Sequence, residues 1–374
     1  MNTIIIIPAL NPDEKLISYV KSLIQAGEKQ ILIIDDGSSD DCRFIFDFLE
    51  EKEECIVLRH AINMGKGRAL KDAFNYCLTN LSQTASGVIT VDSDGQHSVE
   101  DVLRMKEALT EYTDSLILGA RNFSQENVPP KSAFGNKMTR VVIRLLYGGN
   151  IADTQTGLRA MSYQVLPAFL TLFGERFEYE TGMLIEALQK KIPIKEIEIK
   201  TIYYAENKGT HFRPVSDSWK IYKLIFGTFF KYAFSSFSSS IIDLGSFQLF
   251  SYLLKGTNLS VQVWMATILA RIISSLYNYC VNRNIVFKQD CKGNNTFLKY
   301  YILCVCQMCT SAALVYLFVR VIGLPRLFIK VIVDMLLFFV SFRIQKNGCS
   351  EEINDVVYKN THSTCCIYGV HSVA

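Results

Sequence analysis

Residues 31–40, with the sequence ILIIDDGSSD, join a short apolar run to a polar turn. A short apolar run that ends at turn residues is typical of a buried strand. Similar runs lie at residues 3–7, 55–58, 88–91 and 115–118, with helical patterns between them. This repeating order of strand and helix predicts an α/β domain with a mostly parallel sheet covered on both faces. Because ligands of such sheets bind beyond the carboxyl ends of the strands, the polar residues that follow each strand are the candidate site.

The second half of the chain has a different hydropathy pattern, with apolar stretches long enough to span a bilayer. They lie at residues 232–254, 259–282, 300–319 and 324–342. Charged side chains lie within them, and a charge in a bilayer needs a partner or a cavity. We therefore expect Asp243 to pair with Arg271 and Lys330 to pair with Asp334.

The hydropathy pattern thus divides the chain into three parts. Residues 1–225 form the predicted catalytic domain, and residues 226–346 form a predicted all-α, four-helix transmembrane domain. Residues 347–374 are polar and are expected to be a disordered tail.

Charge and cysteine content bear on partners and location. The net charge of +3 gives no reason to expect a nucleic-acid partner. The 11 cysteines lack the spacing of a disulfide framework, which favours a reducing compartment. Basic residues cluster after the second and the fourth apolar stretch, and such loops lie on the cytosolic side. We expect a multi-pass protein of the cell (inner) membrane, with the catalytic domain and the C-terminus in the cytosol.

Two acidic motifs follow predicted strands. Asp35 and Asp36, followed by a Gly/Ser turn, can accept hydrogen bonds from a base N–H and from ribose hydroxyls. The alternative is a solvated turn that caps a helix. Asp92 and Asp94 follow the strand at residues 88–91, and two such carboxylates can bind Mg²⁺ or Mn²⁺ together with substrate phosphates. A divalent ion there would neutralise a leaving diphosphate, although a simple loop cap is again the alternative.

Seven motifs, in this order and spacing, resemble the family 2 glycosyltransferases, and within them the dolichyl/polyprenyl-phosphate mannose and glucose synthase branch. The motifs are IPALNP (7–12), DDGSSDD (35–41), NMGKGRAL (63–70), VDSDGQH (91–97), GAR (119–121), DTQTGLR (153–159) and RFEYE (176–180). The resemblance covers about the first 215 residues. It implies a nucleotide-binding α/β domain of the GT-A type and inversion at the anomeric carbon.

The resemblance also implies roles for single residues. The nucleotide-sugar contacts are expected at Pro8, Asp13, Asp36, Lys66 and Asp92, and the metal ligands at Asp92, Asp94 and Gln96. Where this family often carries Glu directly after the motif Asn, the chain has Pro12, and the next residue, Asp13, is the candidate to supply that carboxylate.

Basic residues suit an anionic acceptor. A phosphate monoester is mostly ionised at neutral pH, so it can attack without a general base but needs cations to position it. Arg121 and Arg159 suit bidentate phosphate recognition and are, with Asp94, the expected catalytic residues. Lys131 and Arg140 are further acceptor-phosphate candidates, and ordinary surface salt bridges are the alternative for the arginines. In RFEYE, Glu178 and Glu180 either assist catalysis or only order the loop.

A basic amphipathic pattern between residues 137 and 146 favours a lipid acceptor. Five apolar residues share one helical face: Met138, Val141, Val142, Leu145 and Leu146. Basic residues flank that face: Lys137, Arg140 and Arg144. Such a helix either lies on an anionic bilayer or packs on the sheet.

The second half resembles the GtrA-like four-span domain. The fingerprint is RIISS at residues 271–275 and NYCVNRNIVF at residues 278–287, with a fainter second copy at residues 341–345. The resemblance implies movement or anchoring of polyprenyl-phosphate sugars.

Together these patterns predict a metal-dependent, inverting enzyme that moves a hexose from a UDP- or GDP-sugar to a polyprenyl (undecaprenyl) phosphate for cell-surface glycan synthesis. The bilayer is an expected partner, and a homo-oligomer is left open. The alternative is a polyprenyl-phosphate-sugar flippase with a nucleotide-sugar-binding module. A processive polysaccharide synthase is disfavoured because no QxxRW motif exists, and a nicotinamide site because GKG at 65–67 lacks the third glycine of its fingerprint.

Overall fold

The computed structural model describes residues 2–81, 85–122, 130–200, 214–287, 296–322, 329 and 331–345. The chain divides into two compact units, Met1–Ile225 and Phe226–Ala374. The predicted tail at residues 347–374 and Lys330 lie outside the described residues.

The first unit contains a seven-stranded sheet with the order β3-β2-β1-β4-β6-β5-β7. The strands are β1 (Thr3–Ala9), β2 (Ile31–Asp35), β3 (Cys55–Arg59), β4 (Gly87–Thr90), β5 (Leu116–Arg121), β6 (Arg159–Ser162) and β7 (Ile194–Ile199). Only β6 is antiparallel to its neighbours, β4 and β5. The predicted α/β domain with a mostly parallel sheet is therefore confirmed.

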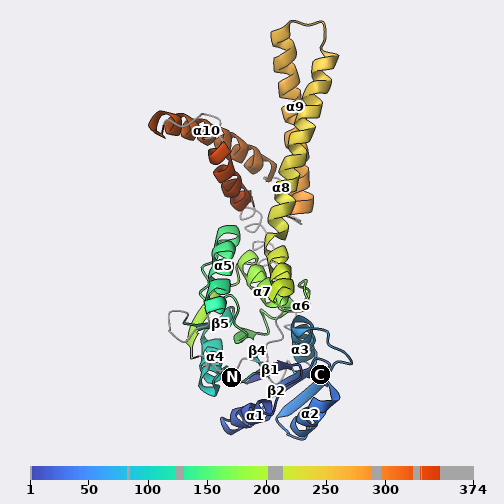
Figure 1. The fold of residues 1–374 in the computed structure, drawn as a ribbon, viewed down its shortest axis with the longest axis vertical. Coiled ribbons are helices and arrows are strands. Elements are labelled where there is room, and N and C mark those ends of the chain that lie inside the picture. The colour runs from blue at the N-terminus through green and yellow to red at the C-terminus, as the bar shows by residue number, and fades with distance from the viewer. Residues whose placement is uncertain are drawn as a thin grey trace, which may run out of the picture. The chain divides into compact units, whose positions relative to one another are not determined.

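Helices cover both faces of this sheet (Figure 1). One face packs against α1 (Lys15–Gln25), α2 (Arg43–Glu50) and α4 (Val99–Glu111). Along the other run α3 (Lys66–Asn80), α6 (Pro167–Leu170) and α7 (Glu178–Gln189), with α5 (Pro130–Tyr147) beside α7. A short 3₁₀ turn, η1 (Asp40–Cys42), precedes α2. Because helices cover both sides, β1 is buried at all seven positions, as its uninterrupted apolar sequence requires.

Strand register brings the acidic motifs to one edge of the sheet. Ala9 pairs with Asp35 across β1 and β2, so the loops that follow these parallel strands begin side by side. β4 is parallel to β1 on its other side and leads into Asp92. Thr90 pairs with Arg159 because β6 runs antiparallel, which places the first residue of β6 beside the last residue of β4.

The second unit is helical. It contains most of α8 (Pro214–Leu253), α9 (Leu259–Val281), a π turn η2 (Asn282–Val286), α10 (Thr296–Ile322) and a helix at residues 331–345. Asp243 on α8 accepts a hydrogen bond from Ser274 on α9 (2.8 Å) and lies 3.4 Å from the Arg271 guanidinium. The predicted pairing of Asp243 with Arg271 is thus confirmed.

The helices of the second unit overlap the predicted apolar stretches. Within the part of the chain that the structure describes, no helix is both long enough and apolar enough to cross a membrane. The four predicted spans are therefore not confirmed by these helices.

Candidate functional site

The loops that follow β1 and β2 are tied to each other. The Asn11 amide N–H donates to Ser38 Oγ (2.9 Å), and the Ser39 amide donates to Asn11 Oδ1 (2.8 Å). Gly37 has a φ of 70°, and a Cβ there would come 2.2 Å from the Ile62 carbonyl carbon. Only glycine combines that conformation with so close an approach, so the predicted turn is fixed against the loop that precedes α3.

Asp36 is directed into the protein. It is 3% exposed, and its carboxylate accepts hydrogen bonds from the backbone N–H groups of Met64 (2.9 Å) and Gly65 (2.8 Å). The His60 ring contacts the same carboxylate at 2.8 Å and lies 3.3 Å from Asp72. Asp36 therefore fixes the start of α3, and its contact with the nucleotide stays a prediction. The role of His60 was missed, because a lone histidine after β3 gives no signal in the sequence.

Lys66 bridges two carboxylates from distant parts of the chain. Its ammonium lies 2.7 Å from Asp92 Oδ1 and 2.9 Å from Glu180 Oε1. Burial lowers the pKa of Lys66, but the two carboxylates raise it more, so the lysine stays protonated. Gly67 makes this contact feasible, since a Cβ there would lie 2.6 Å from Tyr179 Cβ. The glycines of the GKG motif thus allow α3 to pack closely on residues 175–179.

Asp92 lies at the centre of the site. Its second oxygen contacts His97 Nε2 at 3.3 Å, and a Cβ on Gly157 would lie only 2.3 Å from that oxygen. Burial by itself would raise the pKa of the Asp92 carboxyl. The interactions with Lys66 and His97 lower that pKa by more than burial raises it, so the carboxylate is ionised. The loop at residues 153–159 therefore lies directly against the predicted metal ligand. His97 closes the predicted VDSDGQH motif but had no assigned role.

Asp94 and Gln96 form the other part of the predicted metal site. Asp94 Oδ1 accepts the backbone N–H of Gln96 at 3.1 Å. The pKa of Asp94 is raised because its carboxyl group is partly desolvated and is repelled by Asp92. Among the described residues, no group of three or more His, Cys, Asp or Glu side chains is placed to hold a metal. Two neighbouring carboxylates nevertheless fit an ion such as Mg²⁺, which completes its shell with water and substrate phosphates.

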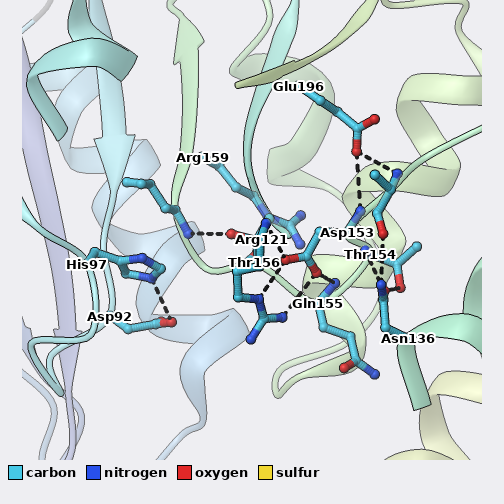
Figure 2. A network of polar contacts seen from close by, with 12 residues as sticks. Asp92, His97, Arg121, Asn136, Asp153, Thr154, Gln155, Thr156, Arg159 and Glu196 are labelled. Atoms are coloured by element: carbon cyan, nitrogen blue, oxygen red, sulfur yellow. Dashed lines mark hydrogen bonds and ion pairs between the residues drawn. The ribbon is translucent and has the colours of Figure 1, made fainter. Parts of the chain in front are cut away.

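Arg121, at the end of β5, forms a two-pronged ion pair with Asp153 (Figure 2). Its Nε and Nη2 lie 2.6 Å and 3.0 Å from the two oxygens of Asp153, and its backbone N–H donates to the same carboxylate (3.2 Å). Asp153 is fully buried, and the Arg121 side chain is 16% exposed. The pair orients the guanidinium, and Asp153, within the DTQTGLR motif, was missed as its partner.

Arg159 lies inside the wall of the site. It is 1% exposed, and it donates to the carbonyl oxygens of Thr156 (3.0 Å) and Glu180 (2.7 Å). Burial lowers its pKa, and the charges of Glu180, Asp153 and Asp92 oppose that shift. Within the described part of the chain its Nη2 has no hydrogen-bond partner. Arg159 therefore orders the backbone around the site, and its contact with phosphate stays a prediction.

The two glutamates of RFEYE have different positions. Glu178 Oε1 accepts the backbone N–H of Glu175 at 3.2 Å, so it orders the loop before α7. Glu180 contacts Lys66 directly. Glu178 thus fits the option of ordering the loop, and assistance to catalysis stays a prediction for Glu180.

The remaining predicted site residues are less informative. Pro8 is buried in β1, and Asp13 is exposed and paired with Lys15 at 3.4 Å. Arg140 is exposed on α5. Lys131 lies in the same helix, and its side chain is outside the described part of the structure.

Helix α5 has one buried and one exposed face, but the exposed face is rotated from the predicted one. Leu146 is buried, and Phe134, which the sequence left out, is 67% exposed. The exposed apolar stripe consists of Phe134, Met138, Val141 and Leu145, and the nearby basic residues Lys137, Arg140 and Arg144 are also exposed. The exposed face is compatible with the predicted contact with a bilayer, and the buried face with the predicted packing inside the domain.

Comparison with known proteins identifies both halves of the chain. Residues 4–169 match Glycosyl transferase family 2, and residues 203–347 match the family described as GtrA/DPMS, transmembrane domain. An uncharacterized protein of Methanocaldococcus jannaschii is 33% identical over 214 residues, or 55% of this chain and 85% of that protein.

Two relatives have named activities. The UDP-N-acetylglucosamine–dolichyl-phosphate N-acetylglucosaminyltransferase of Methanococcus voltae is 30% identical over 230 residues, or 55% of this chain and 89% of that enzyme. The polyprenol monophosphomannose synthase of Mycolicibacterium smegmatis is 29% identical over 170 residues, or 44% of this chain and 63% of that enzyme. The family resemblance of the motifs is confirmed, and the chain is a glycosyltransferase that belongs to glycosyl transferase family 2, with a match to the GtrA/DPMS transmembrane-domain model over residues 203–347.

Proposed function

We propose that the chain transfers a hexose from a UDP- or GDP-sugar to a polyprenyl phosphate such as undecaprenyl phosphate, with inversion, at the cytosolic face of the cell (inner) membrane. The observation that carries the proposal is the arrangement of charge around Asp92. Lys66 and Glu180 lie on one side of it, and Asp94 follows it in the loop. The names of the two relatives above, which give dolichyl or polyprenol phosphate acceptors, support the choice of acceptor.

The donor diphosphate is placed at the carboxyl ends of β1, β2 and β4. Mg²⁺ or Mn²⁺ held by Asp92 and Asp94, with the side chain of Gln96, would neutralise the charge on the leaving diphosphate. The Lys66 ammonium lies beside Asp92 and supplies a second, fixed positive charge at the same place. Asp36 contributes by holding the Met64 and Gly65 amides, which fixes the position of Lys66.

The acceptor phosphate is placed next to Arg121. A phosphate oxygen of the acceptor attacks the anomeric carbon of the donor sugar from the face opposite the diphosphate. The new C–O bond forms as the bond to the diphosphate breaks, the nucleoside diphosphate leaves, and the configuration inverts. Since the attacking phosphate is already ionised, no protein group has to remove a proton. Asp153 holds the Arg121 guanidinium in one orientation, so the guanidinium is already oriented when the acceptor phosphate binds.

A lipid acceptor is supported by α5. Its exposed apolar stripe is flanked by three exposed basic residues, a combination that suits the surface of an anionic bilayer. The match of residues 203–347 to a transmembrane-domain family supports a membrane-bound enzyme.

The test uses purified protein in liposomes with undecaprenyl phosphate and a panel of radiolabelled UDP- and GDP-sugars, with label in the lipid fraction as the readout. We expect one donor to label the lipid, and both EDTA and Asp94→Asn to prevent labelling. Arg43→Gln, an exposed change on α2, serves as the control. Lipid labelling that survives the double change Asp92→Asn and Asp94→Asn would show that transfer does not depend on these carboxylates, whereas a wild type that labels no lipid with any donor would favour the flippase with a nucleotide-sugar-binding module.

A further inference from the structure

Asn136 is a buried polar residue on the inner face of α5, one turn before the exposed Arg140 and two residues after the exposed Phe134. It is 2% exposed, whereas Phe134 is 67% exposed and Leu145 is 63% exposed. A polar side chain on the buried face of an amphipathic helix needs internal hydrogen bonds to offset the loss of water. The partners of Asn136 therefore show what this helix is attached to.

All three hydrogen bonds of Asn136 go to one short loop (Figure 2). Its Oδ1 accepts the backbone N–H of Thr154 (2.9 Å) and the Thr154 hydroxyl (2.8 Å), and its Nδ2 donates to the Ala152 carbonyl oxygen (2.8 Å). From the edge of the sheet, Glu196 Oε1 accepts the backbone N–H groups of Ala152 (2.6 Å) and Asp153 (3.2 Å). Helix α5 and strand β7 thus hold the same loop.

The residue between these anchored positions is Asp153, which holds Arg121. The carboxylate of Asp153 accepts both guanidinium bonds and the Arg121 backbone N–H, and it also accepts the Gln155 N–H at 3.0 Å. The connection from α5 to Arg121 therefore runs through hydrogen bonds between buried or half-buried groups and through the backbone of residues 152–154. A displacement of α5 would move the loop at residues 152–154 and change the orientation of the guanidinium.

We propose that Asn136 is a positioning residue that couples the attachment of α5 to the bilayer with the placement of Arg121 for the lipid phosphate. This proposal rests on the proposed function in taking a lipid phosphate as acceptor. The exposed face of α5 contacts the lipid surface, and Asn136 on the opposite face transmits the position of the helix to the loop. Arg121 is then held in its binding orientation when the protein is attached to the membrane that contains the lipid phosphate.

The experiment compares Asn136→Ala with Thr139→Ala in the full chain. Thr139 is a matched control, because it is 4% exposed on the same helix but donates only to Gly135 within α5 (3.0 Å). In liposomes, Asn136→Ala is expected to raise the KM for undecaprenyl phosphate roughly tenfold, the effect of about one buried hydrogen bond. The KM for the nucleotide-sugar is expected to change less than about twofold, and Thr139→Ala to show no such split.

A second readout does not depend on the identity of the acceptor. Amide hydrogen exchange of the segment 150–156 is measured in nanodiscs that contain phosphatidylglycerol and in detergent. We expect nanodiscs to slow exchange in the wild type and in Thr139→Ala, but not in Asn136→Ala. Thr154→Val, which removes only the hydroxyl bond, provides a milder variant with an intermediate effect.

The outcomes separate the two proposals. If exchange responds to the bilayer equally in Asn136→Ala and the wild type, or if both KM values rise in equal proportion, the coupling is wrong. If the wild type labels no lipid with any donor, the acceptor assignment is wrong, and the exchange comparison still decides whether Asn136 links α5 to the loop.

Discussion

The Lys66 ammonium lies 2.7 Å from Asp92 Oδ1, although Lys66 begins α3 and Asp92 lies in the loop after β4. Desolvation of two charges opposes their attraction, so a buried pair of this kind is weak evidence for stability. The pair is better explained by the position that it gives to the Lys66 charge. It sets a positive charge beside the carboxylate that we propose as a metal ligand, and Glu180 holds the same nitrogen from α7.

Replacing Lys66 with methionine should remove this charge and leave two carboxylates facing each other. We expect transfer activity to be lost, and the free energy of unfolding of the first unit to fall by about 3–5 kcal/mol, the usual effect of removing one partner of a buried pair. Arg68→Met on the same helix is the control, because Arg68 forms a half-exposed pair with Asp72 and should contribute under about 1 kcal/mol. Thermal unfolding and lipid labelling measure both effects. Equal losses in the two variants would contradict the prediction.

The two glutamates of RFEYE should separate in function. Glu180→Gln removes one of the two charges that hold Lys66, and we expect kcat/KM for the nucleotide-sugar to fall about tenfold or more, which corresponds to about 1.4 kcal/mol. Glu178→Gln keeps an oxygen that can accept the Glu175 N–H, so activity should stay near that of the wild type. Steady-state kinetics on both variants provide the measurement. The assignment fails if Glu178→Gln is the more damaging change.

The sheet core was predictable from the sequence, because β1, β2, β3 and β4 are apolar runs that end at turns. β6 and β7 were missed for physical reasons. β6 has four residues and begins at Arg159, while β7 alternates charged and apolar residues as a sheet edge does. Neither resembles the buried runs that identify the other strands.

The candidate site was predictable in its motifs but not in the direction of its side chains. Asp36 and Arg159 belong to the motifs, yet both are buried and bond to the protein. Which way a motif residue points depends on partners such as His60 and Asp153, which long-range packing supplies. The exposed face of α5 was misjudged similarly, because hydrophobic periodicity does not identify Asn136 as the residue that fixes the inner face.

Asp94→Asn should separate charge repulsion from metal binding. Because the pKa of Asp94 is raised in the fold, the native state holds the proton more tightly than the unfolded chain does. Without metal, the resulting stability is present below the unfolded pKa of about 3.9 and is lost as pH rises through the folded pKa. In EDTA, the thermal midpoint of the wild type should therefore fall relative to Asp94→Asn as pH rises from about 4 to 7.

Metal addition should reverse that order. Mn²⁺ at neutral pH is expected to raise the thermal midpoint of the wild type, because an ion that binds only the native state stabilises it by mass action. Asp94→Asn should show little response, since one of its two carboxylates is gone. An equal rise in both proteins would place the ion elsewhere.

Arg121 and Asp153 should act as a unit on the acceptor. Arg121→Ala is expected to raise the KM for undecaprenyl phosphate far more than the KM for the nucleotide-sugar, and Arg121→Lys to recover only part of the loss, because an ammonium cannot reproduce the two-pronged contact. Asp153→Asn should give the same selectivity by releasing the guanidinium, and the double variant should be no worse than Arg121→Ala, since each change removes the same oriented guanidinium.

Arg104→Ala is the matched control: Arg104 also pairs with a fully buried aspartate, Asp101, but on α4 and outside the site. That control should lower thermal stability without changing the ratio of the two KM values. A ratio that moves equally in Arg104→Ala and Arg121→Ala would show that loss of a buried pair, and not loss of the phosphate contact, produces the effect.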